Sequence, residues 1–207
     1  MPRPALSARR LLGFDRSGPP PAETTPDAPL RPWTIPNAIG YARAALIPAI
    51  LIFAYASNNG TTAGTGICFF FAGAGDYADG ITARITGQYS RMGAILDPVL
   101  DRLLALSGLA ICWSFELLPR WLIAVVIARE ALMLVLGQAW LRRGLALAIN
   151  WPGRVAVGPT LFGIWLALLG VRSVAESFLY VGITLALIAT GYYLRDGMRQ
   201  LGGSGRK

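Results

Sequence analysis

Hydrophobic residues in this chain are gathered in long stretches separated by short polar segments, and they do not alternate with polar residues. Each long stretch approaches the roughly 20 apolar residues that an α-helix needs to cross a bilayer. Six such helices are expected, at residues 38–57, 63–85, 92–114, 120–141, 154–171 and 175–195. The pattern therefore predicts an all-α integral membrane protein with six transmembrane helices and short loops.

The composition supports the membrane class and leaves little room for a second domain. Of the 207 residues, 54% are hydrophobic and only 14% are charged, whereas a soluble domain has about 25% charged residues. We expect one membrane domain at residues 30–200. Residues 1–29, rich in Pro, Ala and Arg, are predicted to be a disordered cytoplasmic tail, and residues 201–207 a disordered C-terminus.

The basic residues are distributed as membrane topology requires, so the net charge of +8 does not predict a nucleic-acid partner. Arginines are frequent before the first stretch, after the second and fourth stretches, and at the C-terminus, and they are rare at the other turnarounds. By the positive-inside rule, both termini and the loop after the second helix are cytoplasmic. The expected location is the bacterial cytoplasmic membrane.

Four aspartates interrupt the apolar pattern between residues 76 and 101. A carboxylate in the middle of a membrane helix costs about 2.5–3.5 kcal/mol on insertion scales, so such residues usually have a function. They form two pairs, three and four residues apart, and each pair shares one face of its helix. The short turn at about 86–91 makes the two helices antiparallel neighbours, so the pairs are expected to converge. The four residues are Asp76, Asp79, Asp97 and Asp101.

Divalent cations are the expected partners of these acids, because no lysine cluster accompanies them in the sequence. An all-oxygen ligand set in a chain without histidine favours Mg²⁺ or Mn²⁺ over zinc. Four negative charges match two divalent ions, and a two-metal site suits displacement at phosphorus. Gly80 would let a ligand approach the helix backbone, and Arg84 can reach a phosphate. The sequence therefore predicts a polar, metal-lined cavity open to the cytoplasm.

The spacing D-x2-D-G-x2-A-R-x8-G-x3-D-x3-D, which begins at Asp76, resembles the signature of the CDP-alcohol phosphotransferases at every fixed position. Further similarities are Ile35-Pro36-Asn37 with Arg43, Ile127-Ala128-Arg129-Glu130 and Trp151-Pro152-Gly153-Arg154. They resemble the phosphatidylglycerophosphate synthase and cardiolipin synthase branch over about residues 33–195. Relatives commonly carry Gly-Lys where this chain has Gly153-Arg154, which bears on the acceptor pocket more than on the chemistry.

The resemblance implies a six-helix membrane enzyme, often a homodimer, that displaces CMP from CDP-diacylglycerol. By this resemblance the four aspartates would hold the metal ions, and Asp101 would also act as general base on the acceptor hydroxyl. The residues implied to contact CDP-diacylglycerol are Asn37, Gly80, Arg84 and Ser90. The favoured acceptor is sn-glycerol 3-phosphate, giving phosphatidylglycerophosphate, and the alternative is phosphatidylglycerol, giving cardiolipin.

Two arginines outside the motif are candidates for binding an anionic acceptor. Arg129 either holds the acceptor phosphate or closes a buried ion pair, and the same structural interpretation applies to Glu130. Adjacent helix positions point about 100° apart, so we do not expect these two side chains to pair with each other. Arg154 either binds the acceptor phosphate or anchors its helix at the membrane interface.

A membrane cation transporter is the more distant alternative, because carboxylates inside membranes also mark ion pathways. Against it, all four acids lie in one helical hairpin, and the other half of the chain has no equivalent, as inverted repeats would show. An inactive scaffold of the same fold is disfavoured because every acid of the motif is present. Release of CMP separates the enzyme from both.

Overall fold

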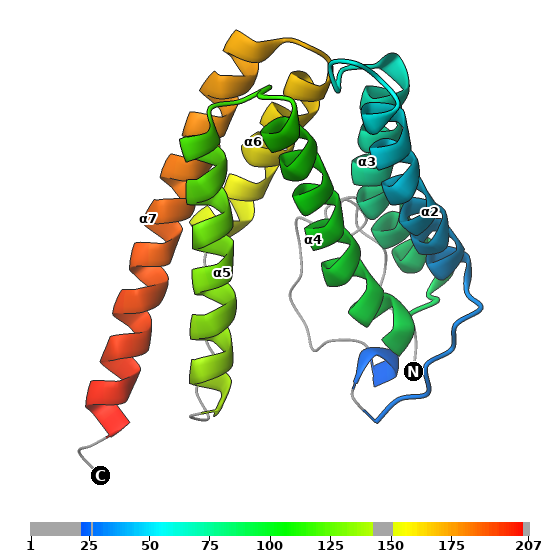
Figure 1. Cartoon of the computed structure of the whole chain (residues 1–207). Coiled ribbons are helices and arrows are strands. Elements are labelled where there is room, and N and C mark those ends of the chain that lie inside the picture. Colours follow the sequence, from blue (N-terminus) through cyan, green and yellow to red (C-terminus); the bar gives the residue numbers. More distant parts are fainter. Residues whose placement is uncertain (1–21, 26, 143–150, 205–207) are drawn as a thin grey trace. The chain divides into compact units, whose positions relative to one another are not determined.

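The computed structural model describes residues 22–25, 27–142 and 151–204 and is helical in all its regular elements (Figure 1). A single turn of 3₁₀-helix precedes six long α-helices in the described part of the chain. The elements are η1 (Ala22–Thr24), α2 (Ile35–Tyr55), α3 (Ala63–Thr86), α4 (Arg91–Ser114), α5 (Arg120–Arg142), α6 (Trp151–Leu168) and α7 (Arg172–Ser204).

The six predicted helices are confirmed as helices, and most of their ends lie within about three residues of the expected positions. The largest difference is at α7, which continues to Ser204 and so enters the segment predicted to be disordered. Helical hydrogen bonding propagates readily past the apolar part of a helix, which periodicity alone does not reveal. The turn η1 lies in the predicted N-terminal tail, and the rest of that prediction, for residues 1–21 and 26, falls outside the described residues.

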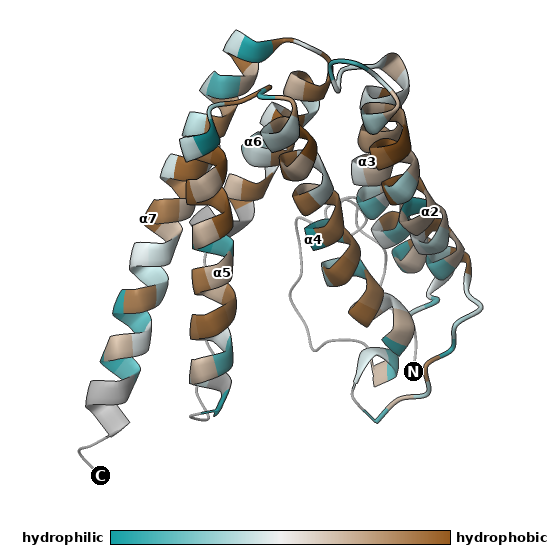
Figure 2. Ribbon diagram, in the orientation of Figure 1, coloured by the Kyte–Doolittle hydropathy of each residue, from teal (hydrophilic) through white to brown (hydrophobic). Residues whose placement is uncertain are grey.

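Length and composition qualify three of the described helical stretches as membrane spans, Ile35–Tyr55, Arg120–Trp140 and Arg172–Gln200, and Val155–Leu168 is a shorter apolar stretch. Helices α3 and α4 are long enough, but the aspartates and arginines of the motif interrupt their apolar sequence. Figure 2 shows the same pattern, in which predominantly hydrophobic helices are broken by hydrophilic positions. The structure thus supports a helical membrane protein.

The chain divides into two compact units, of which the first comprises residues 1–53 and 64–107. In this unit α2 and α3 pack with the first part of α4 around buried Ile50, Phe69 and Leu104. Helix α3 ends at Gly87, whose φ of +66° is a conformation that glycine adopts without steric cost. The chain then needs only residues 87–90 to reach α4, which makes α3 and α4 a tight hairpin.

The second unit comprises residues 54–63 and 108–207 and contains α5, α6 and α7. Helix α7 packs against both α5 and α6. Its approach to α6 is close, because a Cβ atom added to Gly182 would lie 2.3 Å from Oγ1 of Thr160. Near the other end of α7, the rings of Trp140 and Tyr193 stack with their centroids 4.4 Å apart. Small residues therefore set the α6–α7 distance, and aromatic rings fill the α5–α7 contact.

Candidate active site

Arg43 of α2 lies at the centre of the predicted acidic site in the first unit. Its Nε donates to the carbonyl oxygen of Ala72 at 2.9 Å, so the guanidinium is fixed against the backbone of α3. One terminal nitrogen, NH1, donates to Asp79 Oδ2 at 2.9 Å and to Asp76 Oδ1 at 3.3 Å. The other, NH2, donates to Asp101 Oδ1 of α4 at 2.7 Å. The arginine therefore joins three helices through their charged side chains.

The acids around this arginine differ in exposure. The side chains of Arg43 and Asp79 are 3% and 6% exposed, so this ion pair is enclosed. Asp76 and Asp101 are 48% and 47% exposed, so each turns one edge toward the outside of the unit. Asp97 is partly buried and interacts electrostatically with the other three acids and with Arg43, which does not hydrogen-bond to it. The structure thus brings the four predicted acids together, as the helical spacing requires.

The role of Arg43 is the main point that the sequence-based interpretation missed. That interpretation found no lysine cluster near the aspartates and assigned their neutralisation to metal ions. The signal was present, because Arg43 is the single basic residue in the apolar stretch at 38–57. A lone cation in such a stretch predicts a buried acidic partner.

Two glycines of α3 have different surroundings. A Cβ atom at Gly75 would lie 2.7 Å from both Cγ and Cδ of Arg43, so this position must lack a side chain for the arginine to pass. At Gly80 the nearest such neighbour is a terminal nitrogen of Arg84, at 3.5 Å, which is ordinary contact. A methyl group at Gly80 would therefore meet only the end of the Arg84 side chain, and Arg84 is partly buried.

The side chains of Asn37 and Ser90 are hydrogen-bonded to each other, and both residues are buried. The Ser90 hydroxyl donates to Asn37 Oδ1 at 2.9 Å and accepts from the backbone N–H of Gly93 at 3.0 Å. The amide nitrogen of Asn37 donates to the carbonyl oxygens of Arg31 and Pro32, each at 3.0 Å. These bonds occupy the amide of Asn37 within the protein. Its predicted contact with substrate, and that of Ser90, therefore stays a prediction.

Gly93 of the motif has a structural explanation in this network. A Cβ atom there would approach Asn37 Oδ1 to 2.9 Å and Ser90 Oγ to 3.3 Å. Since neither polar group can withdraw without losing a hydrogen bond, glycine is the residue that fits. The two motif glycines therefore differ: a side chain at Gly93 would press on the Asn37–Ser90 hydrogen bond, whereas a methyl group at Gly80 would fit in ordinary contact with Arg84.

Arg129 and Glu130 of α5 belong to the second unit, and the expectation that they do not pair is wrong. NH1 of Arg129 donates to Oε1 of Glu130, and Nε lies 3.4 Å from the hydroxyl oxygen of Thr190 in α7. The two Cβ atoms do diverge by about 100°, but the long arginine side chain bends back along the helix surface. Arg129 is thus largely buried and already has an acidic partner. The side chain of Arg154 lies outside the described residues.

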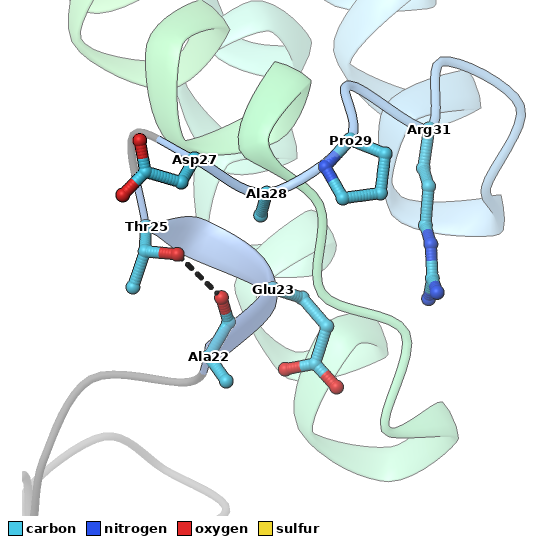
Figure 3. Close-up of a pocket in the computed structure, with 7 residues that line it drawn as sticks. All are labelled: Ala22, Glu23, Thr25, Asp27, Ala28, Pro29 and Arg31. Atoms are coloured by element: carbon cyan, nitrogen blue, oxygen red, sulfur yellow. Dashed lines mark hydrogen bonds between the residues drawn. The ribbon is translucent and has the colours of Figure 1, made fainter.

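Figure 3 shows a surface hollow near the N-terminal turn, and it is separate from the acidic site. One continuous piece of chain lines it, and the Thr25 hydroxyl closes the turn by donating to the Ala22 carbonyl oxygen at 2.8 Å. None of the predicted site residues contributes to its lining, and most residues that do are exposed. The hollow therefore does not serve as a candidate for the active site.

The donor chemistry of the acidic cluster fits divalent cations. Asp76 and Asp79 direct one oxygen each at the same guanidinium nitrogen, so carboxylates from one helix turn already point at a common centre. Oxygen ligands of this kind suit Mg²⁺ and Mn²⁺. Among the described residues, however, no three acidic, cysteine or histidine side chains are arranged to hold one ion directly. Three of the four aspartates instead hydrogen-bond to the Arg43 guanidinium.

Comparison with known proteins decides the family. The sequence model of the CDP-alcohol phosphatidyltransferase family matches residues 33–190, which includes the acidic cluster and extends into α7. The chain belongs to this family. The predicted class, a phosphatidyltransferase of phospholipid biosynthesis, is thereby confirmed.

Three bacterial relatives in the CDP-alcohol phosphatidyltransferase family illustrate the similarity. A Mycobacterium tuberculosis protein, named provisionally as a cardiolipin synthase, is 32% identical over 162 residues, 77% of this chain and 76% of that protein. The CMP-forming cardiolipin synthase of Streptomyces coelicolor is 36% identical over 141 residues, 66% and 65% of the two chains. The CDP-diacylglycerol–glycerol-3-phosphate 3-phosphatidyltransferase of Pseudomonas fluorescens is 30% identical over 191 residues, 84% and 94% of the two chains. The names of these relatives thus correspond to both enzyme types between which the sequence did not decide.

Proposed function

We propose that this protein transfers the phosphatidyl group of CDP-diacylglycerol to a hydroxyl of a glycerol-based acceptor and releases CMP. The observation that carries the proposal is the convergence of Asp76 and Asp79 from α3 with Asp101 from α4 on one centre. Facing carboxylates on two helices can bind the cations that a pyrophosphate needs and also accept a proton. Both capacities are required for this transfer.

In the proposed reaction the acceptor hydroxyl oxygen bonds to the phosphorus that carries diacylglycerol. The bond between that phosphorus and the oxygen bridging the two phosphates breaks, so CMP leaves with the bridging oxygen. Asp101 takes the hydroxyl proton. Its Oδ1 is held by Arg43 at 2.7 Å, which orients the carboxylate, and Asp101 is half exposed, so its second oxygen is accessible to an acceptor.

Asp76, Asp79, Asp97 and Asp101 would hold the divalent cations, Mg²⁺ or Mn²⁺ and by charge balance two of them. Such cations supply neutralisation of the pyrophosphate and of the departing CMP. Gly80, which has no side chain next to Asp79, and Arg84, whose side chain lies beside Gly80, would receive the phosphates of CDP-diacylglycerol. Arg84 offers a planar fork of N–H donors that matches phosphate oxygens.

The proposed topology has six spans with both termini in the cytoplasm. It is supported by the six long helices of the described residues and by the arginines at alternate helix ends. Helices α3 and α4 would span because their charged residues face the site and one another. The homodimer stays a prediction.

For the acceptor we propose sn-glycerol 3-phosphate, with phosphatidylglycerol as the second candidate. The similarity to the Pseudomonas fluorescens protein, which spans 84% of this chain, supports the first. The higher identity to the Streptomyces coelicolor cardiolipin synthase, 36%, supports the second. Both acceptors carry a phosphate, so both need a cation in the acceptor pocket.

The test is CMP release by purified protein from CDP-diacylglycerol in detergent micelles or liposomes. Labelled glycerol 3-phosphate and phosphatidylglycerol are supplied in parallel, with Mg²⁺, with Mn²⁺ and with EDTA. We expect metal-dependent CMP and labelled phosphatidylglycerophosphate. Product from phosphatidylglycerol alone would overturn the acceptor assignment, and no metal-dependent CMP with either acceptor would overturn the function. Asp76→Asn, in the same assay, controls for contaminating enzymes.

A further inference from the structure

Every nitrogen of the Arg43 guanidinium is hydrogen-bonded within the protein. All three of its nitrogens donate hydrogen bonds, to one carbonyl oxygen and three carboxylates, and the side chain is 3% exposed. A buried charge is stable only when it is paired and hydrogen-bonded. The same bonds hold the carboxylates of two helices at one point. Arg43 thus positions carboxylates that would otherwise repel each other.

We propose that Arg43 is a positioning residue that holds the acidic cluster together and competes with divalent cations for it. The proposal rests on the proposed function in taking the aspartates as the cation ligands. Its new content is that α2 supplies these acids with a cation of the protein's own, the Arg43 guanidinium. Occupation of the site by metal then requires the carboxylates to exchange part of their bonds with Arg43.

The competition follows from charge and space. Three carboxylates hydrogen-bond to one guanidinium, so negative charge remains in excess and still attracts divalent cations. A positive guanidinium within a few ångströms of the ligands repels those cations, and inside a protein this repulsion is strong. Neutralising Arg43 should therefore raise the affinity for divalent cations and lower the stability of the protein in EDTA. If Arg43 only filled space, its substitution by a residue of similar size would change neither quantity.

Gly75 shows that the protein is shaped around this side chain. The absent Cβ at Gly75 would fall 2.7 Å from Cγ and Cδ of Arg43. Because Gly75 has no side chain, the Arg43 side chain of α2 can extend past it to the acids of α3. This packing is a separate observation from the hydrogen bonds, and it also places the Arg43 side chain against α3.

The experiment uses the full-length protein in detergent, with Arg43→Gln and the matched control Arg120→Gln. Arg120 pairs with Glu116 at 2.8 Å, but the two side chains are 55% and 69% exposed. In EDTA we expect the apparent Tm of Arg43→Gln to fall by at least about 6 °C, because buried acids lose their partner. Arg120→Gln should shift it by no more than about 3 °C.

The second measurement is Mn²⁺ binding, followed by the rise in Tm and by loss of the free-Mn²⁺ electron paramagnetic resonance signal. We expect the half-saturating Mn²⁺ concentration of Arg43→Gln to be at least about tenfold below that of wild type. Mn²⁺ should also recover much of the Tm lost in EDTA. An equal or higher half-saturating concentration would overturn the competition.

The double variant Arg43→Gln/Asp79→Asn separates charge pairing from packing. Removing both members of the enclosed pair should recover part of the Tm lost in Arg43→Gln, since no uncompensated buried acid then remains at residue 79. If the Tm loss of the double variant equals the sum of the losses of the two single variants, the pairing is overturned. If Arg43→Gln does not fold, Arg43→Lys decides, because lysine keeps the charge but has a single nitrogen for three carboxylates. It should lower the Tm in EDTA, and an unchanged Tm would overturn the proposal.

The same data distinguish this proposal from the proposed function. Absence of any Mn²⁺ response and of CMP release in the wild type would overturn the metal site and, with it, the competition. A normal wild-type response together with an Arg43→Gln variant that behaves like Arg120→Gln would overturn the role of Arg43 alone.

Discussion

Both units of the protein place arginines on apolar helices, but they partner them differently. In the first unit, Arg43 of α2 bonds to acids of α3 and α4, so its partners come from other helices. In the second unit, Arg129 pairs with Glu130, its neighbour on α5, and meets α7 only through the hydroxyl of Thr190. The first arrangement fixes helices to one another, and the second neutralises charge within a single helix.

This difference separates residues that shape the site from residues available to a ligand. Arg43 has no nitrogen without a bond inside the protein, so it cannot bind substrate without reorganising the site. Arg129 has a single acidic partner, and that partner, Glu130, is 48% exposed. An anionic ligand can therefore compete for Arg129 more easily. The predictions below test each side of this comparison.

The largest effect is expected from Asp101→Asn. The amide oxygen can still accept the hydrogen bond from Arg43, so the helix contact and the Tm should be nearly retained. The general base is lost, and kcat should fall by about 10²–10⁴-fold with binding of CDP-diacylglycerol preserved. CMP release and labelled-lipid binding are the two measurements. Asp196→Asn, in an exposed pair with Arg195, is the control. Undiminished turnover would remove Asp101 from the mechanism.

Arg129→Gln should raise KM for the anionic acceptor about tenfold or more, because a charged hydrogen bond to phosphate contributes about 1.5–3 kcal/mol. KM for CDP-diacylglycerol should change little. Glu130→Gln is the informative counterpart, since it frees Arg129 from its acidic partner and should leave acceptor KM unchanged or lower. A fall in Tm in both variants with no change in either KM would assign the pair to structure alone.

The two glycines of α3 are expected to respond in opposite ways to alanine. Gly75→Ala places a methyl group against Arg43 and should destabilise the protein by about 1–3 kcal/mol. Gly80→Ala has room for its methyl group and should leave stability unchanged or raise it by up to about 1 kcal/mol. If phosphates lie beside Gly80, that variant should instead raise KM for CDP-diacylglycerol. Thermal unfolding and steady-state kinetics on both variants give the contrast, which equal losses of stability would contradict.

The smallest effect is expected from Glu116→Gln. Its bond to Arg120 joins two exposed side chains, one in the turn after α4 and one at the start of α5, and Arg120 also lies 5.7 Å from the ring centre of Trp113. Exposed pairs of this kind contribute at most about 1 kcal/mol. Thermal unfolding should therefore shift by no more than about 3 °C. A larger loss would show that local pairs in the second unit matter more than the comparison allows.

Helix positions and the acidic site were predictable because they rest on short-range rules. Apolar stretches located six helices, and spacings of three and four placed Asp76 with Asp79 and Asp97 with Asp101. Gly87 and a turn of residues 87–90 then brought the pairs together. Each of these steps depends on residues close in sequence.

What could not be predicted depends on contacts between distant residues or on side-chain flexibility. Arg43 reaches Asp101 across 58 positions of sequence, and helical periodicity gives no rotation of α2 relative to α4. The same applies to the bond between Asn37 and Ser90. For Arg129 and Glu130 the rule about neighbouring Cβ directions was applied to a side chain long enough to bend around it.

Helix α2 is held at two levels, by Asn37 near its start and by Arg43 six residues later. At 1.5 Å per residue these levels are about 9 Å apart along the axis. With one attachment the helix could rotate about its axis, whereas two attachments at different heights fix its rotation. Inserting a single residue between them would turn Arg43 by about 100° relative to Asn37 and point it away from the aspartates. The segment 38–42 is therefore expected not to tolerate a change of length.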